Sequence, residues 1–235
     1  MIIYWGVLGQ PEDFLLLNYF EPQPVTDILS SLEINSPPTD NFKNCPAVRQ
    51  QLKNVFSLKF PFDNEITFDD ENLTTSKYDQ EFWNYMIKIR SLKDKNLGFN
   101  IKYLFVSEES VEVESTACWF SQNDFVNKTI LVPGKFNIGK WTRPLDCAFL
   151  VKDGYNSIKI NRGDDYSYLK INTDEEVVLK KFYITDKLKQ IMFSNLKTRQ
   201  YKIKPIEKLA YYYNLYEKAK MHKLVMREIK SNLME

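Results

Sequence analysis

The chain has 235 residues, of which 43% are hydrophobic, 14% aromatic and 27% charged, and its formal net charge is +1. This composition excludes a wholly disordered chain and a collagen, and the length suits one large domain or two small ones. One histidine and three widely spaced cysteines cannot supply a two-histidine metal triad, a zinc set of two Cys and two His, or a disulfide framework. We therefore expect no metal, no cofactor and a reducing compartment.

The first part of the chain predicts short elements separated by prolines. Pro46 suits the first position of a helix, and Thr26 or Asp27 suits the cap of another. Alternation with period two predicts a strand before the turn at 61–64 and a return strand after it. The predicted elements are strands at 1–8 and 14–20, helical turns at 25–32, a helix at 46–53, and strands at 55–60 and 65–68.

Residues 79–90 fit two patterns at once. Trp83 and Met86 share one face of a helix, whereas Tyr85 and Ile87 alternate as they would in a strand. The pattern leaves both structures open for this segment.

The stretch 97–184 predicts a ladder of short strands with turn residues such as Pro133-Gly134 and Asp153-Gly154 between them. The predicted strands are 98–106, 111–114, 116–121, 129–132, 135–141, 145–152, 157–161, 165–172 and 177–184. Short, regularly spaced strands without helical patterns between them favour an antiparallel arrangement. We assign residues 1–184 to a mainly β domain, an antiparallel sandwich with a jelly-roll-like core.

Residues 185–235 predict a helical C-terminal segment that packs on this domain or on a partner. Thr185 suits the cap of one helix, and Pro205 suits the start of a longer helix that reaches residue 232. One face of the longer helix is apolar, which makes it the candidate interaction surface for a partner protein or a second copy. The residues proposed for this interaction helix are Leu215, Ala219, Val225, Met226 and Ile229. His222 lies on the same stripe and is interpreted as a packed side chain.

Charge is distributed unevenly along the chain. Residues 1–80 sum to −7, whereas residues 180–230 carry fourteen Lys or Arg against four acids and sum to +10. This asymmetry indicates a basic face that meets an acidic one, and the sequence ranks a protein partner above a nucleic acid. A membrane span is not expected, because no run of about 18 apolar residues occurs.

Two local patterns concern possible sites. Trp141 and Arg143 lie on the same side of an extended chain and can form a binding lip for a sugar or nucleotide, or pack at a sheet corner. The acidic clusters, among them Asp164-Asp165, are interpreted as solvated turn residues. Glu112 and Glu114 share a strand face that is interpreted as a wet surface.

Three strings resemble an uncharacterised family of proteins from tailed bacteriophages of marine bacteria: NCPAV at 44–48, LKNVFSLK at 52–59 and GKWTRP at 139–144. The string IKINRGD at 158–164 is similar to cupin-like β-sandwich proteins of the same phages. The resemblance covers roughly residues 1–185 and implies a host bacterial cytoplasm or a virion as the location. It carries over no functional residues.

These observations favour a non-enzymatic interaction protein or a virion-associated structural protein. The alternatives are a small-ligand or carbohydrate-binding β-sandwich with its site at Trp141 and Arg143, or a metal-independent enzyme.

Overall fold

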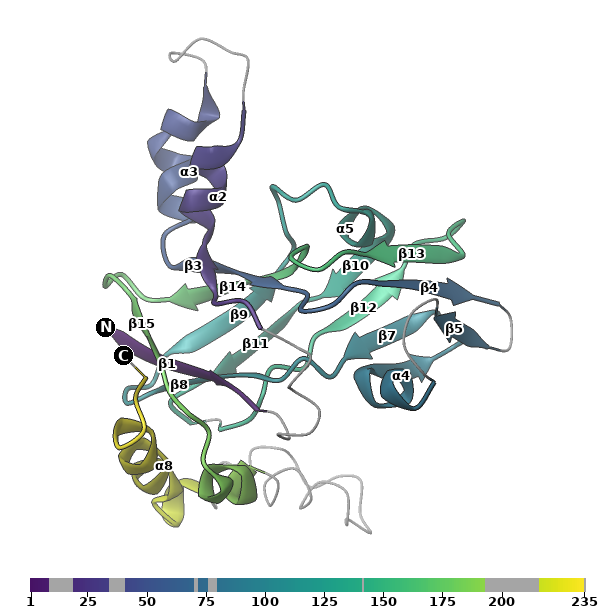
Figure 1. Ribbon diagram of the computed structural model, residues 1–235. Coiled ribbons are helices and arrows are strands. Elements are labelled where there is room, and N and C mark those ends of the chain that lie inside the picture. Colours follow the sequence, from purple (N-terminus) through teal and green to yellow (C-terminus); the bar gives the residue numbers. More distant parts are fainter. Residues whose placement is uncertain are drawn as a thin grey trace.

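A computed structural model describes residues 1–8, 19–33, 41–69, 72–75, 80–140, 142–192 and 216–234. Within these ranges the molecule is mainly β, and several sheets pack around a shared core with helices on the outside (Figure 1). The strands are β1 (Ile2–Val7), β2 (Gln23–Pro24), β3 (Val55–Lys59), β4 (Asn64–Phe68), β5 (Leu73–Thr75), β6 (Ile87–Ser91), β7 (Asn96–Phe99), β8 (Tyr103–Ser107), β9 (Glu112–Thr116), β10 (Thr129–Val132), β11 (Gly134–Asn137), β12 (Ala148–Val151), β13 (Ser157–Ile160), β14 (Asp165–Asn172) and β15 (Val178–Lys181). The helices are α2 (Val25–Ser31), the short 3-10 helix η1 (Phe42–Asn44), α3 (Pro46–Gln51), α4 (Gln80–Met86), α5 (Asp124–Lys128) and α8 (Met221–Lys230).

The strands form sheets in the orders β15-β1-β8, β10-β12-β7-β6, β11-β9-β14-β3-β2 and β13-β4-β5. Neighbours are antiparallel except β1 and β15, which run parallel. The predicted fold class, a mainly β antiparallel sandwich-like core with a helical C-terminal region, is confirmed.

The three-stranded sheet β15-β1-β8 is covered on both faces. Trp5 and Phe105 point into the main core, whereas their neighbours Tyr4 and Leu104 point the other way, into a second core that includes α8. A strand buried on both faces has a continuous apolar sequence instead of an alternating one. This explains why every residue of β8 is buried.

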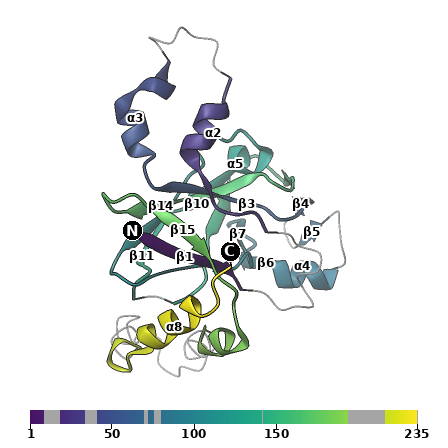
Figure 2. The ribbon, with the colours of Figure 1, turned by 60° about the vertical axis from the view of Figure 1, so that its left-hand side comes forward.

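A third core lies on the outer face of the five-stranded sheet. Val25 and Leu29 of α2 and Leu52 after α3 pack on Val55 and Tyr168 of the sheet. Figure 2 shows α2 and α3 on the opposite side of the molecule from α8. The two helical covers are therefore built on different sheets.

Two predicted strand arrangements are wrong. β4 does not return along β3 but pairs with β13 and β5, while β3 pairs with β14 and β2. The predicted strand 98–106 is divided at residues 100–102, and its halves, β7 and β8, belong to different sheets. Neither pairing partner nor a change of sheet is encoded in local periodicity.

Other predictions are refined by the structure. The described part of the segment 79–90, from residue 80 on, takes both forms in succession, as α4 and then β6. Only Thr116 of the predicted strand 116–121 is in a strand, as the last residue of β9, and the chain then turns at 119–120. α2 begins after Pro24 without a side-chain cap from Thr26 or Asp27. Most of the predicted strand 14–20 lies outside the described residues.

The C-terminal helices differ from the prediction at one place. Thr185 caps the helix at 186–192, because its Oγ1 accepts from the Leu188 amide at 3.3 Å. Lys220 has a left-handed backbone with φ 51°, so α8 starts afresh at Met221 instead of continuing one long helix. Residues 193–215, where that helix was predicted to begin, lie outside the described residues.

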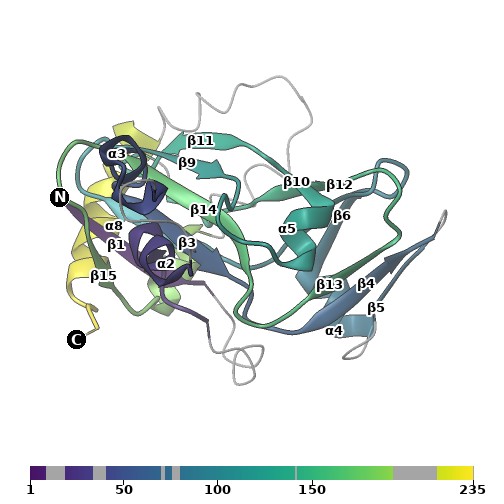
Figure 3. The same ribbon diagram turned by 90° about the horizontal axis from the view of Figure 1, so that it is seen from above.

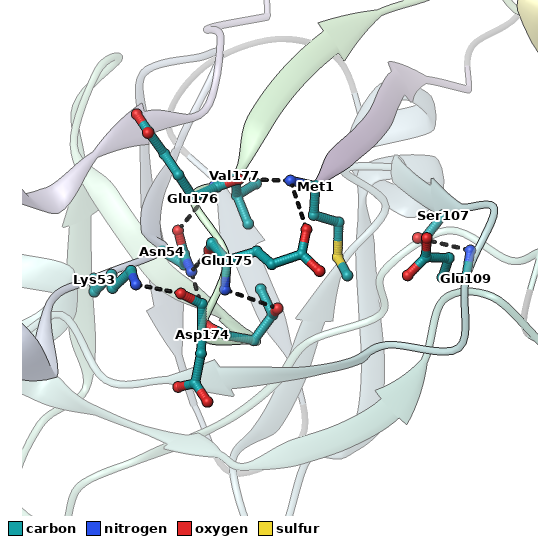
Figure 4. Close-up of polar contacts among 10 residues, drawn as sticks. Met1, Lys53, Asn54, Ser107, Glu109, Asp174, Glu175, Glu176 and Val177 are labelled. Carbon is teal, nitrogen blue, oxygen red and sulfur yellow. Dashed lines mark hydrogen bonds and ion pairs between the residues drawn. The ribbon is translucent and has the colours of Figure 1, made fainter.

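Asn54 connects the five-stranded sheet to the turn before β15. Its side-chain Nδ2 donates to the carbonyls of Thr173 (3.0 Å) and Glu175 (2.7 Å), and its Oδ1 accepts from the Val177 amide (3.2 Å). Figure 4 shows this clamp beside Met1, whose ammonium donates to the Glu176 carbonyl at 2.7 Å. The turn is therefore fixed from both sides.

Candidate functional site

A polar cleft opens between α2 and the end of the five-stranded sheet. Its volume is about 410 Å³. Figure 3 shows α2 and α5 apart from each other along this sheet. The lining comes from α2, from β2 and β3, from the turn before α5 and from the turn before β14. The lining residues are Gln23, Ile28, Ser31, Lys59, Ser121, Gln122, Asn123, Gly163, Asp164 and Asp165.

Asp165, at the start of β14, forms the floor of the cleft and is only 9% exposed. Its Oδ1 accepts from the Ser57 hydroxyl at 2.5 Å, and its Oδ2 accepts from the Ser121 hydroxyl. The side-chain Nδ2 of Asn123 donates to the backbone carbonyl of Asp165 at 2.8 Å, and the Lys59 ammonium lies 4.0 Å from Oδ1. A buried carboxylate is tolerated when its oxygens are paired in this way.

The turn before β14 is built to place Asp165. Gly163 adopts φ +91°, which favours glycine, and its amide donates to the Phe60 carbonyl at 2.9 Å. Asp164 Oδ2 accepts from the Asn161 amide at 2.9 Å and closes the turn. The register of β14 against β3 shifts between Asp165 and Ser167, so a bulge turns the carboxylate toward Ser57.

The arrangement suits recognition by hydrogen bonds. Ser57 is fully buried and commits its hydroxyl to Asp165, so it is a structural donor. The side chains of Gln23 and Gln122 add amides, each with both donors and an acceptor. In the part of the chain that the structure describes, no three His, Cys, Asp or Glu side chains gather as metal ligands would.

The predicted ligand site at Trp141 and Arg143 does not coincide with this cleft. Arg143 is half-buried and does not line it, and Trp141 lies outside the described residues. Gly139 of the same string sits so close to the Glu109 carbonyl that an added Cβ would be 2.2 Å from its oxygen. The corner-packing interpretation therefore fits this part of the string.

The predicted interaction helix is used within the chain. Val225, Met226 and Ile229 are buried in the second core with Tyr4 and Phe182, so they offer no exposed face to a partner. This corrects the expectation of an exposed apolar surface. Ala219 is exposed and precedes α8, and Leu215 lies outside the described residues.

His222 packs at the inner edge of α8 beside β8. Burial lowers its pKa, against the opposing effect of the Ser107 and Glu108 backbone and the Glu108 carboxylate. Glu108 in turn accepts from Lys230 Nζ at 2.7 Å and from the Tyr4 hydroxyl at 3.2 Å. Hydrogen bonding from Lys230 keeps the pKa of Glu108 below its usual value.

Sequence reasoning missed Asp165, which was expected to be a solvated turn residue. Its burial is visible only in the structure, where Asp165 opens a strand whose next four residues are also buried. The interpretation of Glu112 and Glu114 agrees with the structure, since both carboxylates share Lys135 on an exposed sheet face.

Comparisons of the chain with models of protein families, with curated proteins and with solved structures find no match. In the ranges that the structure covers, no helix is long and apolar enough to cross a membrane.

Proposed function

We propose that the protein is a non-enzymatic binding protein whose cleft around Asp165 holds a small polar ligand, with a neutral carbohydrate as the ligand class. The observation that carries the proposal is the buried carboxylate held by Ser57 and Ser121 at the floor of a polar cleft. Such a group is fixed before any ligand arrives, which reduces the entropy lost on binding.

The lining favours a neutral, hydroxyl-rich ligand. Most small-molecule pockets are largely apolar, but here Ile28 is the one aliphatic lining residue among amides, hydroxyls and charges. Lys59 lies against Asp165, and the second lining carboxylate, Asp164, accepts from the backbone and side chain of Asn161, so the charged groups of the cleft are engaged within the protein. Sugar hydroxyls both donate and accept, as do the amides of Gln23 and Gln122.

An NMR titration with glucose, galactose and mannose tests this proposal. We expect a Kd of about millimolar for at least one hexose, because the cleft is open and offers few contacts. Gln122→Ala should weaken that binding about tenfold by removing one hydrogen-bonding group. Gln122 is exposed, so its removal should leave the fold intact.

The matched control is Gln50→Ala, which removes an equally exposed glutamine from α3, away from the cleft lining. It should bind like the wild type. Absence of binding for all three hexoses, or equal effects of the two substitutions, would refute the proposal.

As a second candidate, we propose an interaction or virion-associated protein of the phage type, which assembles with a second copy of itself. The supporting observation is β10, an edge strand on which Ile130 is 52% and Val132 40% exposed. An open, apolar edge strand is a template for pairing with another chain. Light scattering should then show that the wild-type protein is a dimer. Ile130→Lys should disrupt this dimer, whereas Ile89→Lys, at the other edge of the sheet, should not. A monomeric wild-type protein would contradict this second candidate.

A further inference from the structure

Three cations without ion-pair partners in the described ranges lie at the start of α8 and on its outer face. Lys220, Lys223 and Arg227 are exposed, and no ion pair joins them to any residue in the described ranges. Lys223 and Arg227 lie four residues apart on α8, about 40° apart around the helix axis and about 6 Å apart along it, and Lys220 directly precedes the helix. We call Lys220, Lys223 and Arg227 the positive strip; Glu228 lies near Arg227, but it is ion-paired with Lys187.

The neighbouring segments strengthen the positive field. Within residues 177–192 and 216–234 there are nine Lys or Arg and three Asp or Glu, a difference of +6. Two of those acids form ion pairs with other lysines: Glu228 with Lys187 at 2.9 Å, and Asp186 with Lys189 at 3.2 Å. The third acid, Glu217, precedes the positive strip, and no ion pair joins it to the three cations of the strip in the described ranges.

An exposed aromatic side chain lies near the end of the same helix. Tyr183 is 61% exposed, the largest value among the exposed large hydrophobic residues of the described structure. Its amide donates to the carbonyl of Asn232, two residues beyond α8, at 2.8 Å. An exposed aromatic ring can stack on a base of a single strand whose phosphates contact cations.

We propose that the outer face of α8, with Tyr183, binds single-stranded nucleic acid. Lys220, Lys223 and Arg227 contact successive phosphates, and the Tyr183 ring stacks on a base. The apolar face of the helix is buried in the second core, so the helix presents the strip from a fixed position. This surface is separate from the Asp165 cleft, and the proposal does not depend on a ligand there.

Fluorescence anisotropy with a labelled oligo-dT of about 20 nucleotides tests the proposal, from about 50 to 200 mM salt. The wild type should bind, with log K falling linearly with log salt. The triple variant K220Q/K223Q/R227Q should bind more weakly, and its salt slope should be smaller by about 2, because each phosphate contact on a single strand contributes about 0.7.

The matched control is K93Q/K140Q/K159Q, which removes the same charge from exposed lysines on other elements. It should retain the wild-type slope. Tyr183→Ala should weaken binding without changing the slope, and Tyr183→Phe should restore it, since stacking needs the ring and not the hydroxyl. All variants replace exposed side chains, and circular dichroism verifies that they are folded.

Three results would overturn the proposal. The first is no binding of oligo-dT at the lowest salt. The second is an equal loss in the triple variant and its control. The third is binding of polyglutamate as tight as that of oligo-dT, without an effect of Tyr183→Ala, which would assign the strip to an acidic protein surface.

Discussion

The α2 and α3 helices on the five-stranded sheet and the α8 helix on the β15-β1-β8 sheet are both amphipathic covers, but they meet different surfaces, and polar residues line a cleft beside α2. Under α8 the sheet presents apolar side chains such as Leu104 and Phe182, which pack with Val225 and Ile229 in the second core. Under α2 the apolar contacts with Val55 and Tyr168 end before Lys59 and Asp165. A site arises here where the cover stops and the strands continue with polar residues.

The largest expected effects on stability come from truncating one buried side chain under each of the two helical covers. Ile229→Ala under α8 and Leu29→Ala under α2 each remove a buried side chain, and each should lower the free energy of unfolding by about 2–5 kcal/mol. Denaturant titration measures this loss. Of the two variants, only Leu29→Ala should also weaken hexose binding. Equal effects of both variants on binding would contradict the claim that the site depends on the α2 cover alone.

The Asn54 clamp, which connects the two regions, should have the next largest effect. Asn54→Ala loses three hydrogen bonds, and alanine tolerates the left-handed backbone at φ 58° less well than asparagine does. The substitution should therefore lower the free energy of unfolding by roughly 2–4 kcal/mol. Asn54→Gly loses the same bonds but accepts the backbone angle, and thermal unfolding should show it to be the more stable of the two. If Asn54→Ala were the more stable variant, the left-handed backbone angle would not destabilise alanine at this position.

Ser57→Ala tests the floor of the cleft. It removes a hydroxyl donor from a buried carboxylate and should cost about 1.5–3 kcal/mol, the usual range for a hydrogen bond to a charged group. Ser31→Ala, on an exposed residue at the rim, should change the unfolding free energy little. Chemical denaturation measures both variants. An unchanged free energy of unfolding in Ser57→Ala would mean that the Ser57 hydroxyl does not stabilise the Asp165 carboxylate.

The smallest effect concerns pH and the α8 cover. Burial lowers the pKa of His222, so the folded chain binds fewer protons there than the unfolded chain. The contribution of His222 to stability is complete above its unfolded pKa, near 6.5, and declines as the pH falls below that value. Glu108 faces the same ring, and its own lowered pKa keeps it charged in this range.

His222→Phe should remove this part of the pH dependence between pH 7.5 and 5.5, while wild-type stability declines over the same range. Unfolding curves at several pH values measure it. An identical slope in both proteins would assign the dependence to other groups.

The sequence predicts the class of fold well because strands and helix starts depend on local chemistry. Pro46 at the start of α3 and the Thr185 cap were both predictable from short-range rules. The separation of β3 from β4 and the division at 100–102 were not, because strand pairing depends on residues distant in the chain. Local patterns therefore define elements but not their neighbours.

The candidate site could not be predicted for the same reason. Asp165 resembles any acidic turn residue until Ser57, Ser121 and Lys59, from distant positions in the chain, are placed around it. The apolar face of α8 was predictable from its 3.6-residue period, but the period does not show whether a partner or the chain's own sheet covers it.

A crystal structure of the protein soaked with the hexose that binds most tightly in solution tests the central claim most directly. The account predicts one sugar ring in the Asp165 cleft, with its hydroxyls hydrogen-bonded to Gln122 or Gln23, and no sugar beneath α8. A sugar bound elsewhere, with the cleft free of it, would contradict the claim that this cleft is the binding site.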